Sequence, residues 1–220
     1  MNQELIHVYL MPGMAANPSI FEYIDLPTDR FKIHRLEWII PHKQESLTDY
    51  ALRMCGFVDS SYPVLVGVSF GGILVQEMSK HISIQKLIII SSVKSRKELP
   101  RRMKLARQTK GYKLIPTQLA SKLDMLARFA YGDIIKKRFE LYKKYLSISD
   151  PAYLNWALEQ LLNWEQTEPP AEIIHIHGEK DGVFPVRYLD DYISIKNGTH
   201  LMILNRYKWF NRNLPGLILS

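Results

Sequence analysis

A single serine stands between two glycines where an apolar segment pauses, in the stretch VLVGVSFGGILVQ at residues 64–76. Polar turn residues such as Asn, Asp or Pro are absent there, and a second apolar run begins at once. A serine hydroxyl is a poor nucleophile at neutral pH unless a base accepts its proton and a third group orients that base. Ser69 is therefore a candidate nucleophile, and the sequence must also supply a base and an acid.

An acid and a histidine follow Ser69 along the chain, each just after an apolar segment. Asp181 lies in HIHGEKDGVFP at residues 175–185, and His200 lies in KNGTHLMI at residues 196–203. The carboxyl ends of strands in open α/β sheets are the edge where such proteins place their sites. Ser69, Asp181 and His200 are therefore expected to meet at one edge of a sheet.

Other acids and histidines compete less well for these roles. Asp190 and Asp191 lie at the start of the last expected strand and so fall at the opposite edge of the sheet, and Glu179 shares the loop of Asp181. His175 and His177 lie two residues apart on a strand and share one face, but no convincing third metal ligand accompanies them. They are interpreted as strand residues, and no metal site is predicted.

The elements that must position these residues alternate along the chain. Apolar segments of strand length lie at residues 4–13, 31–38, 62–68, 85–92, 171–181 and 191–200. Helices are expected at 47–58 after the capping residue Ser46, at 71–82, from the capping pair Asp150-Pro151, and at 201–210. Strands that are apolar on both faces and alternate with helices predict an α/β fold with a mostly parallel sheet of about six strands and helices on both faces. Between about 95 and 165 only helical signals occur, including TQLASKLDMLARFA at 117–130.

Taken together, GVSFGG, GEKDGVFP and GTH resemble the α/β-hydrolase superfamily, and the order of elements matches over the whole chain. The resemblance implies that Ser69 is the nucleophile, His200 the general base and Asp181 the orienting acid. It also implies an oxyanion hole formed by the backbone amides of Met14 and Phe70. No organic cofactor or metal is implied.

The chain departs from the superfamily pattern in two places. It has no room for the β-hairpin with which many members begin, so the first strand leads directly to the oxyanion loop. That loop reads Met11-Pro12-Gly13-Met14 where many members read His-Gly. Backbone amides do the work of such a loop, so the substitution leaves its chemistry available.

The resemblance also implies the domain organisation: one α/β-hydrolase domain at residues 1–220 with a helical cap inserted at about 95–165. Aromatic residues of the cap and of the strand ends are candidates for a substrate pocket, although aromatics at helical spacing more often serve packing. The predicted substrate contacts are Gly13, Trp38, Phe129 and Trp156.

Charge is concentrated in the same interval. The chain of 220 residues carries a net charge of +7. Between residues 94 and 147 there are 16 Lys or Arg against 4 Asp or Glu. This basic run includes Arg101, Arg102 and Lys104. It indicates either a solvated helix face or a docking surface for an acidic carrier protein, an anionic surface or a charged ester. No nucleic-acid-binding motif accompanies it, so nucleic acid is not a predicted partner.

The remaining expectations concern location and activity. No signal peptide or membrane-spanning segment is evident, which predicts a cytoplasmic protein. The predicted function is hydrolysis of a small-molecule carboxylic ester or thioester through an acyl-serine. The alternatives are a carbon–carbon bond hydrolase or lyase with the same triad, and a ligand-sensing or scaffold protein on the hydrolase fold.

Overall fold

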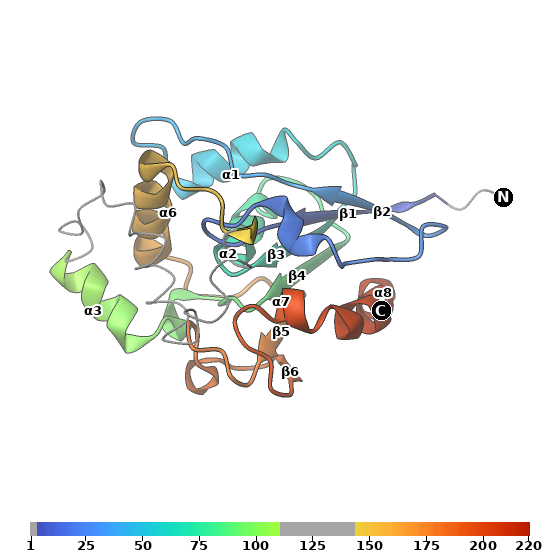
Figure 1. Cartoon of the computed structure of the whole chain (residues 1–220). Coiled ribbons are helices and arrows are strands. Elements are labelled where there is room, and N and C mark those ends of the chain that lie inside the picture. The colour runs from blue at the N-terminus through green and yellow to red at the C-terminus, as the bar shows by residue number, and fades with distance from the viewer. Residues whose placement is uncertain (1–3, 111–143) are drawn as a thin grey trace.

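A computed structural model describes residues 4–110 and 144–220, and Figure 1 shows a central sheet with helices on either side. The sheet has six strands in the order β2-β1-β3-β4-β5-β6, and every neighbouring pair is parallel. The strands are β1 (Ile6–Met11), β2 (Phe31–Arg35), β3 (Val64–Val68), β4 (Lys86–Ile90), β5 (Ile173–Gly178) and β6 (Ile193–Ile195). The predicted α/β class and mostly parallel sheet are confirmed.

Side chains that alternate along the strands feed two separate apolar cores. In β1, Tyr9 and Met11 enter one core, while Val8 and Leu10 enter the other. Burial of both faces explains why the strands are continuous apolar runs rather than alternating ones. All five residues of β3 are buried, which places the segment before Ser69 at the centre of the sheet.

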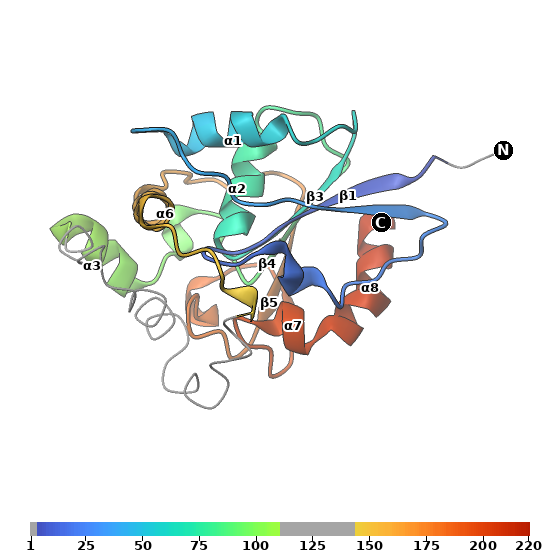
Figure 2. The ribbon, with the colours of Figure 1, turned by 45° about the horizontal axis from the view of Figure 1, so that its top comes forward.

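Helices cover both faces of the sheet, as Figure 2 shows from a second direction. Residues of α1, α2, α3 and α6 build the first core, and residues of η1, α7 and α8 build the second. The helical elements are η1 (Pro18–Phe21), α1 (Leu47–Cys55), α2 (Phe70–Met78), η2 (Arg96–Glu98), α3 (Arg101–Thr109), α6 (Pro151–Asn163), η5 (Val186–Tyr188), α7 (Met202–Asn205) and α8 (Tyr207–Leu219).

Two of the expected helix starts are capped as their sequences predict. Ser46 accepts a hydrogen bond from the Asp49 amide at the start of α1. Asp150 accepts one from the Tyr153 amide at the start of α6, with Pro151 in the first helical turn. These caps fix where the two helices begin on the sheet.

The structure differs from expectation mainly at element ends. The single helix expected at 201–210 is two helices, because Arg206 leaves helical geometry with φ −121° and separates α7 from α8. The strand expected at 171–181 ends at Gly178, so Asp181 lies in the loop beyond it. Within 95–165, the described residues form η2, α3 and α6, whereas the helix expected at 117–130 lies outside the described residues.

Candidate active site

Ser69 lies at a sharp turn between the central strand β3 and helix α2. Its backbone has φ 54° and ψ −122°, a conformation that a residue with a side chain adopts only under strain. The chain can fold so tightly because of its glycines: a Cβ on Gly67 would lie 2.3 Å from the Gly71 carbonyl oxygen, and one on Gly71 would lie 2.3 Å from the Pro12 carbonyl oxygen. The glycines on both sides of Ser69 are thus required by close backbone contacts.

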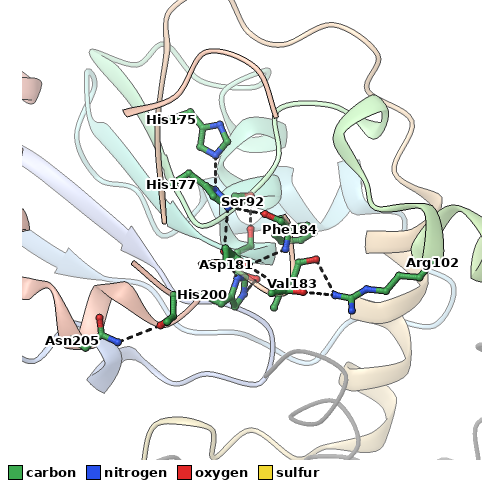
Figure 3. Close-up of polar contacts among 12 residues, drawn as sticks. Ser92, Arg102, His175, His177, Asp181, Val183, Phe184, His200 and Asn205 are labelled. Carbon is green, nitrogen blue, oxygen red and sulfur yellow. Dashed lines mark hydrogen bonds and ion pairs between the residues drawn. The ribbon is translucent and has the colours of Figure 1, made fainter. Parts of the chain in front are cut away.

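The three residues singled out from the sequence meet at the carboxyl edge of the sheet. The Ser69 Oγ atom lies 2.9 Å from His200 Nε2, and His200 Nδ1 lies 2.8 Å from Asp181 Oδ2. They come from the ends of three different parallel strands, β3, β5 and β6, and Figure 3 shows His200 beside Asp181. This arrangement allows a proton to pass from the serine hydroxyl to an imidazole that a carboxylate orients.

The Asp181 carboxylate is buried and surrounded by donors. Its Oδ1 atom accepts the backbone amides of Val183 at 2.8 Å and Phe184 at 3.0 Å, while Oδ2 faces His200. Burial by itself raises the pKa of this carboxyl, but the neighbouring His200 and the backbone donors outweigh it and hold the pKa below its usual range. Asp181 is therefore ionised at neutral pH and able to orient the imidazole.

The loops that carry Asp181 and His200 are bonded to each other. A Cβ on Gly178 would lie 2.4 Å from the Gly198 carbonyl oxygen, so the chains touch there. The same carbonyl accepts the Lys180 amide at 2.8 Å, and the Ile195 carbonyl accepts the Glu179 amide at 3.2 Å. These contacts fix the separation of acid and base independently of their side chains.

The loop after β1 faces Ser69 across a narrow gap. A Cβ on Gly13 would lie 3.2 Å from Ser69 Cβ, and Met14 lines the hollow that contains Ser69 and His200. Phe70 is the first residue of α2, where a backbone amide has no acceptor within its own helix. Gly13 and Met14 therefore lie beside Ser69, close to the start of α2 at Phe70.

Two of the predicted aromatic substrate contacts, Trp38 and Trp156, lie in the core. Trp38 and Trp156 are each 8% exposed, and both rings pack against Phe70 in the core. The Trp38 indole donates to the Gly13 carbonyl oxygen and the Trp156 indole to the Glu45 carbonyl oxygen. In the structure both indoles contact protein groups, and Phe129 lies outside the described residues.

An apolar hollow adjoins Ser69 and His200, and it was not predicted. Its walls come from η1, from residues 145–146 and from the start of α7, with Ile20, Leu146, Leu201 and Leu204 among them. The segment 144–148 is bonded to both ends of η1. The Tyr145 carbonyl oxygen accepts the Asn17 amide, and Lys144 Nζ lies 2.7 Å from Glu22 Oε2. These residues are far apart in sequence, so periodicity alone could not group them.

Two further residues near Asp181 were also missed as parts of the site. His177, interpreted only as a strand residue, lies 3.3 Å from Asp181 Oδ2, and its position four residues before the acid was the available signal. Arg102, counted with the basic run, donates from Nη2 to the carbonyls of Gly182 at 2.8 Å and Val183 at 3.0 Å. Figure 3 shows both contacts.

Several other charges of the basic run are engaged within the protein. Lys94 is buried and donates to the Asp190 carbonyl oxygen, and Lys97 pairs with Glu168 at 2.7 Å. Arg107 pairs with Glu165 at 2.8 Å. Part of the basic run therefore stabilises the fold and is not a bare positive surface.

Within residues 4–110 and 144–220, no group of three or more His, Cys, Asp or Glu side chains is arranged to hold a metal ion. Within the same part of the chain, no helix has the length and apolar character needed to cross a membrane.

Comparison with known proteins identifies the fold. No protein-family model matches the sequence, and no curated protein matches it. Among solved structures, a hydrolase from Pseudomonas aeruginosa is similar with a TM-score of 0.75 and 12% identity, over 98% of this chain and 91% of that one. A thermophilic esterase from Thermogutta terrifontis gives a TM-score of 0.71 and 14% identity, over 97% and 89%.

A bromoperoxidase from Bacillus anthracis gives a TM-score of 0.70 and 17% identity, over 100% of this chain and 94% of that one. With the six parallel strands and the turn at Ser69, these similarities show that the chain has the α/β-hydrolase fold. That fold carries several chemistries, so the reaction must be argued from the site.

Proposed function

We propose that the protein is a serine hydrolase that cleaves a carboxylic ester or thioester through an acyl-serine intermediate. The observation that supports this most directly is the 2.9 Å contact of Ser69 Oγ with His200 Nε2, with Asp181 behind the imidazole at 2.8 Å. In this proposal residues 1–220 form one domain, and the helical interval of about 95–165 forms the cap.

In the first half of the proposed reaction, Ser69 Oγ attacks the substrate carbonyl carbon while its proton moves to His200 Nε2. The negative charge that develops on the carbonyl oxygen is stabilised by the amides of Met14 and Phe70, and such donors contribute roughly 3 kcal/mol each. The bond to the leaving group then breaks, and His200 returns its proton to the leaving oxygen or sulfur. Asp181 stabilises the imidazolium throughout.

In the second half, a water molecule enters in place of the leaving group. His200 accepts a proton from the water, whose oxygen attacks the acyl carbon, and the tetrahedral species releases Ser69 as it regains that proton. The products are a carboxylic acid and an alcohol or thiol. Every proton moves through His200, so the reaction needs no further cofactor.

The apolar hollow narrows the substrate class in this proposal. A charged group would lose hydration against Ile20, Leu146 and Leu201, and burial of an unpaired charge is costly. We expect an uncharged, apolar group on the side of the ester that enters this hollow. Its burial contributes about 0.8 kcal/mol for each CH₂ removed from water.

Several similar structures support the reaction class by analogy. Besides the esterase and the hydrolase, they include a putative lipase from Acinetobacter baumannii at 14% identity and an enol-lactonase from Burkholderia xenovorans at 11% identity. All four names describe hydrolytic enzymes, and lactones are cyclic esters. Because identity is this low, the names support the reaction class and not a substrate.

The test is intact-mass labelling with a fluorophosphonate, which phosphonylates an activated serine. We expect one adduct on the wild-type protein and none on Ser69→Ala or His200→Ala. Ser194→Ala, which removes an exposed serine on β6, serves as the control and should be labelled like the wild type. Steady turnover of uncharged esters should follow.

A folded wild-type protein that gives no adduct and no ester turnover would contradict the proposal and favour a ligand-sensing or scaffold role. Labelling without turnover of any ester or thioester would favour the carbon–carbon hydrolase or lyase alternative.

A further inference from the structure

We infer that His177 is a positioning residue that acts on the reaction through Asp181, an inference that rests on the proposed function. His177 is the fifth residue of β5 and is fully buried. Its Nε2 atom lies 2.9 Å from the Phe184 carbonyl oxygen and 3.3 Å from Asp181 Oδ2. Figure 3 shows the ring on the side of Asp181 away from His200.

The partners of His177 determine where its proton sits. The Phe184 carbonyl oxygen can only accept a hydrogen bond, so the Nε2 atom of His177 must carry the hydrogen. In the neutral ring Nδ1 then has a lone pair, and it lies 3.1 Å from His175 Nε2, which donates to it. Both rings are thereby held as Nε2–H tautomers, and the hydrogen bonds run in one direction from His175 through His177 to the Phe184 carbonyl oxygen.

The His177 N–H donates to the Phe184 carbonyl oxygen, and the same Nε2 atom lies 3.3 Å from the carboxylate oxygen that orients His200. Asp181 Oδ2 accepts His200 Nδ1–H at 2.8 Å, and the His177 Nε2 atom lies 3.3 Å from the same oxygen. Oδ1 is held by the amides of Val183 and Phe184. Rotation of the carboxyl group would break these hydrogen bonds at both oxygens, and His177, held by its bond to Phe184, keeps its polar Nε2 edge beside Oδ2.

His177 also closes the loop that carries the acid. Phe184 donates its amide to Asp181 Oδ1 and accepts from His177 at its carbonyl oxygen. The loop from the end of β5 to Phe184 is therefore tied to the strand that precedes it. A histidine that only stabilised the fold could make the same contacts. Its replacement would then lower kcat/KM equally whether or not residue 181 carries a carboxylate.

The experiment is a double-mutant cycle between His177 and Asp181, with kcat/KM for an uncharged activated ester as the readout. We expect His177→Phe to lower kcat/KM by about 10- to 100-fold, because the buried Phe184 carbonyl loses its donor and the Asp181 carboxylate loses the polar edge beside Oδ2. In the Asp181→Asn background the same change should cost less than about 3-fold, because the carboxylate on which His177 acts is gone. His177→Gln, whose amide can donate from near the Nε2 position, should recover most of the loss.

Equal losses in both backgrounds would show that His177 acts on the fold alone and would overturn the inference. His34→Gln, which changes a strand histidine at the far edge of the sheet, is the matched control and should leave kcat/KM unchanged.

A second measurement does not depend on turnover. NMR of the wild-type protein with labelled histidine should show His177 and His175 as neutral Nε2–H tautomers. The far-downfield proton between His200 and Asp181 should shift or broaden in His177→Phe and not in His34→Gln. A His177 that carries its proton on Nδ1 would overturn the inference. These spectra remain interpretable if the protein proves not to hydrolyse esters, so the two failures are distinguishable.

Discussion

The indole nitrogen of Trp38 donates to the carbonyl oxygen of Gly13 at 2.9 Å, across 25 residues of sequence. The same ring stacks on Phe70, with ring centroids 5.2 Å apart and planes 11° from parallel. One buried side chain therefore contacts both segments that would form the oxyanion hole. Trp38 as a substrate contact stays a prediction, and these two contacts also suit it to align Gly13 with the residue after Ser69.

Trp38→Phe should therefore lower kcat for ester hydrolysis by about 10-fold and leave KM nearly unchanged. The hydrogen bond aligns amides whose contribution arises as charge develops in the transition state, so ground-state binding is spared. Steady-state kinetics with a chromogenic ester measures both constants.

The matched control for Trp38 is Trp164→Phe. This change also removes a buried indole hydrogen bond, from Trp164 Nε1 to Glu77 Oε1 at 2.8 Å, but away from the site. It should cost stability of about 1–3 kcal/mol with kcat preserved. A change in KM with kcat unchanged for Trp38→Phe would contradict the alignment role.

Two glycines offer a paired test of the turn at Ser69. Gly71→Ala places a Cβ 2.3 Å from the Pro12 carbonyl oxygen, so either α2 or the oxyanion loop must move. We expect at least a 100-fold loss of activity with a lower midpoint of thermal unfolding. Gly216→Ala, whose Cβ meets nothing within 4 Å in α8, should be neutral or stabilising by up to about 1 kcal/mol. Gly71→Ala with wild-type activity would mean that the backbone contact is not required.

The fold and the meeting of three residues were predictable because both follow from local signals. Apolar segments buried on both faces mark parallel strands, and residues just past their ends share an edge, which brought Ser69, Asp181 and His200 together. The sequence also marked Ser46 and Asp150 as helix caps, and both make the expected hydrogen bonds.

What could not be predicted depends on contacts between distant segments. Nothing in the sequence near Trp38 indicates that its indole reaches Gly13, and Arg102 reaches the acid loop from another part of the chain, 80 residues before Gly182. The basic run that contains Arg102 suggested only a solvated or docking surface. Side-chain direction in three dimensions, rather than residue type, separates these roles.

Stability should fall as the pH falls below neutrality, chiefly because of buried histidines. Burial, followed by the nearby His177, lowers the pKa of His175 to about 3, and burial also lowers the pKa of His177. The unfolded chain takes up these protons near pH 6.5, whereas the folded protein takes up that of His175 only near pH 3. The stabilisation is therefore complete above about pH 6.5 and is lost progressively toward pH 3.

His175→Gln removes one of these groups while keeping an amide donor for His177 Nδ1. The slope of unfolding free energy against pH, measured by urea denaturation between pH 4.5 and 6.5, should become shallower by up to about 1.4 kcal/mol per pH unit. The lowered pKa of Asp181 acts in a separate window, at and below its ordinary value of 3.8, and leaves this range unaffected. An unchanged slope would mean that His175 is already protonated in the folded protein.

The last prediction concerns the basic run as a docking surface for acidic or carrier-bound substrates. Arg102 and Lys104 donate to backbone carbonyls within the fold, so neutralising them confounds docking with loss of structure. The sharper variant combines Arg96→Gln, Arg101→Gln and Lys110→Gln, since all three residues are exposed. If the surface docks such substrates, this variant should lower their kcat/KM at low salt by several-fold and spare small neutral esters, and the difference should vanish at high salt. Equal kinetics on both substrate classes would instead assign the exposed charges to solvation alone, leaving the apolar hollow beside His200 as the source of substrate preference.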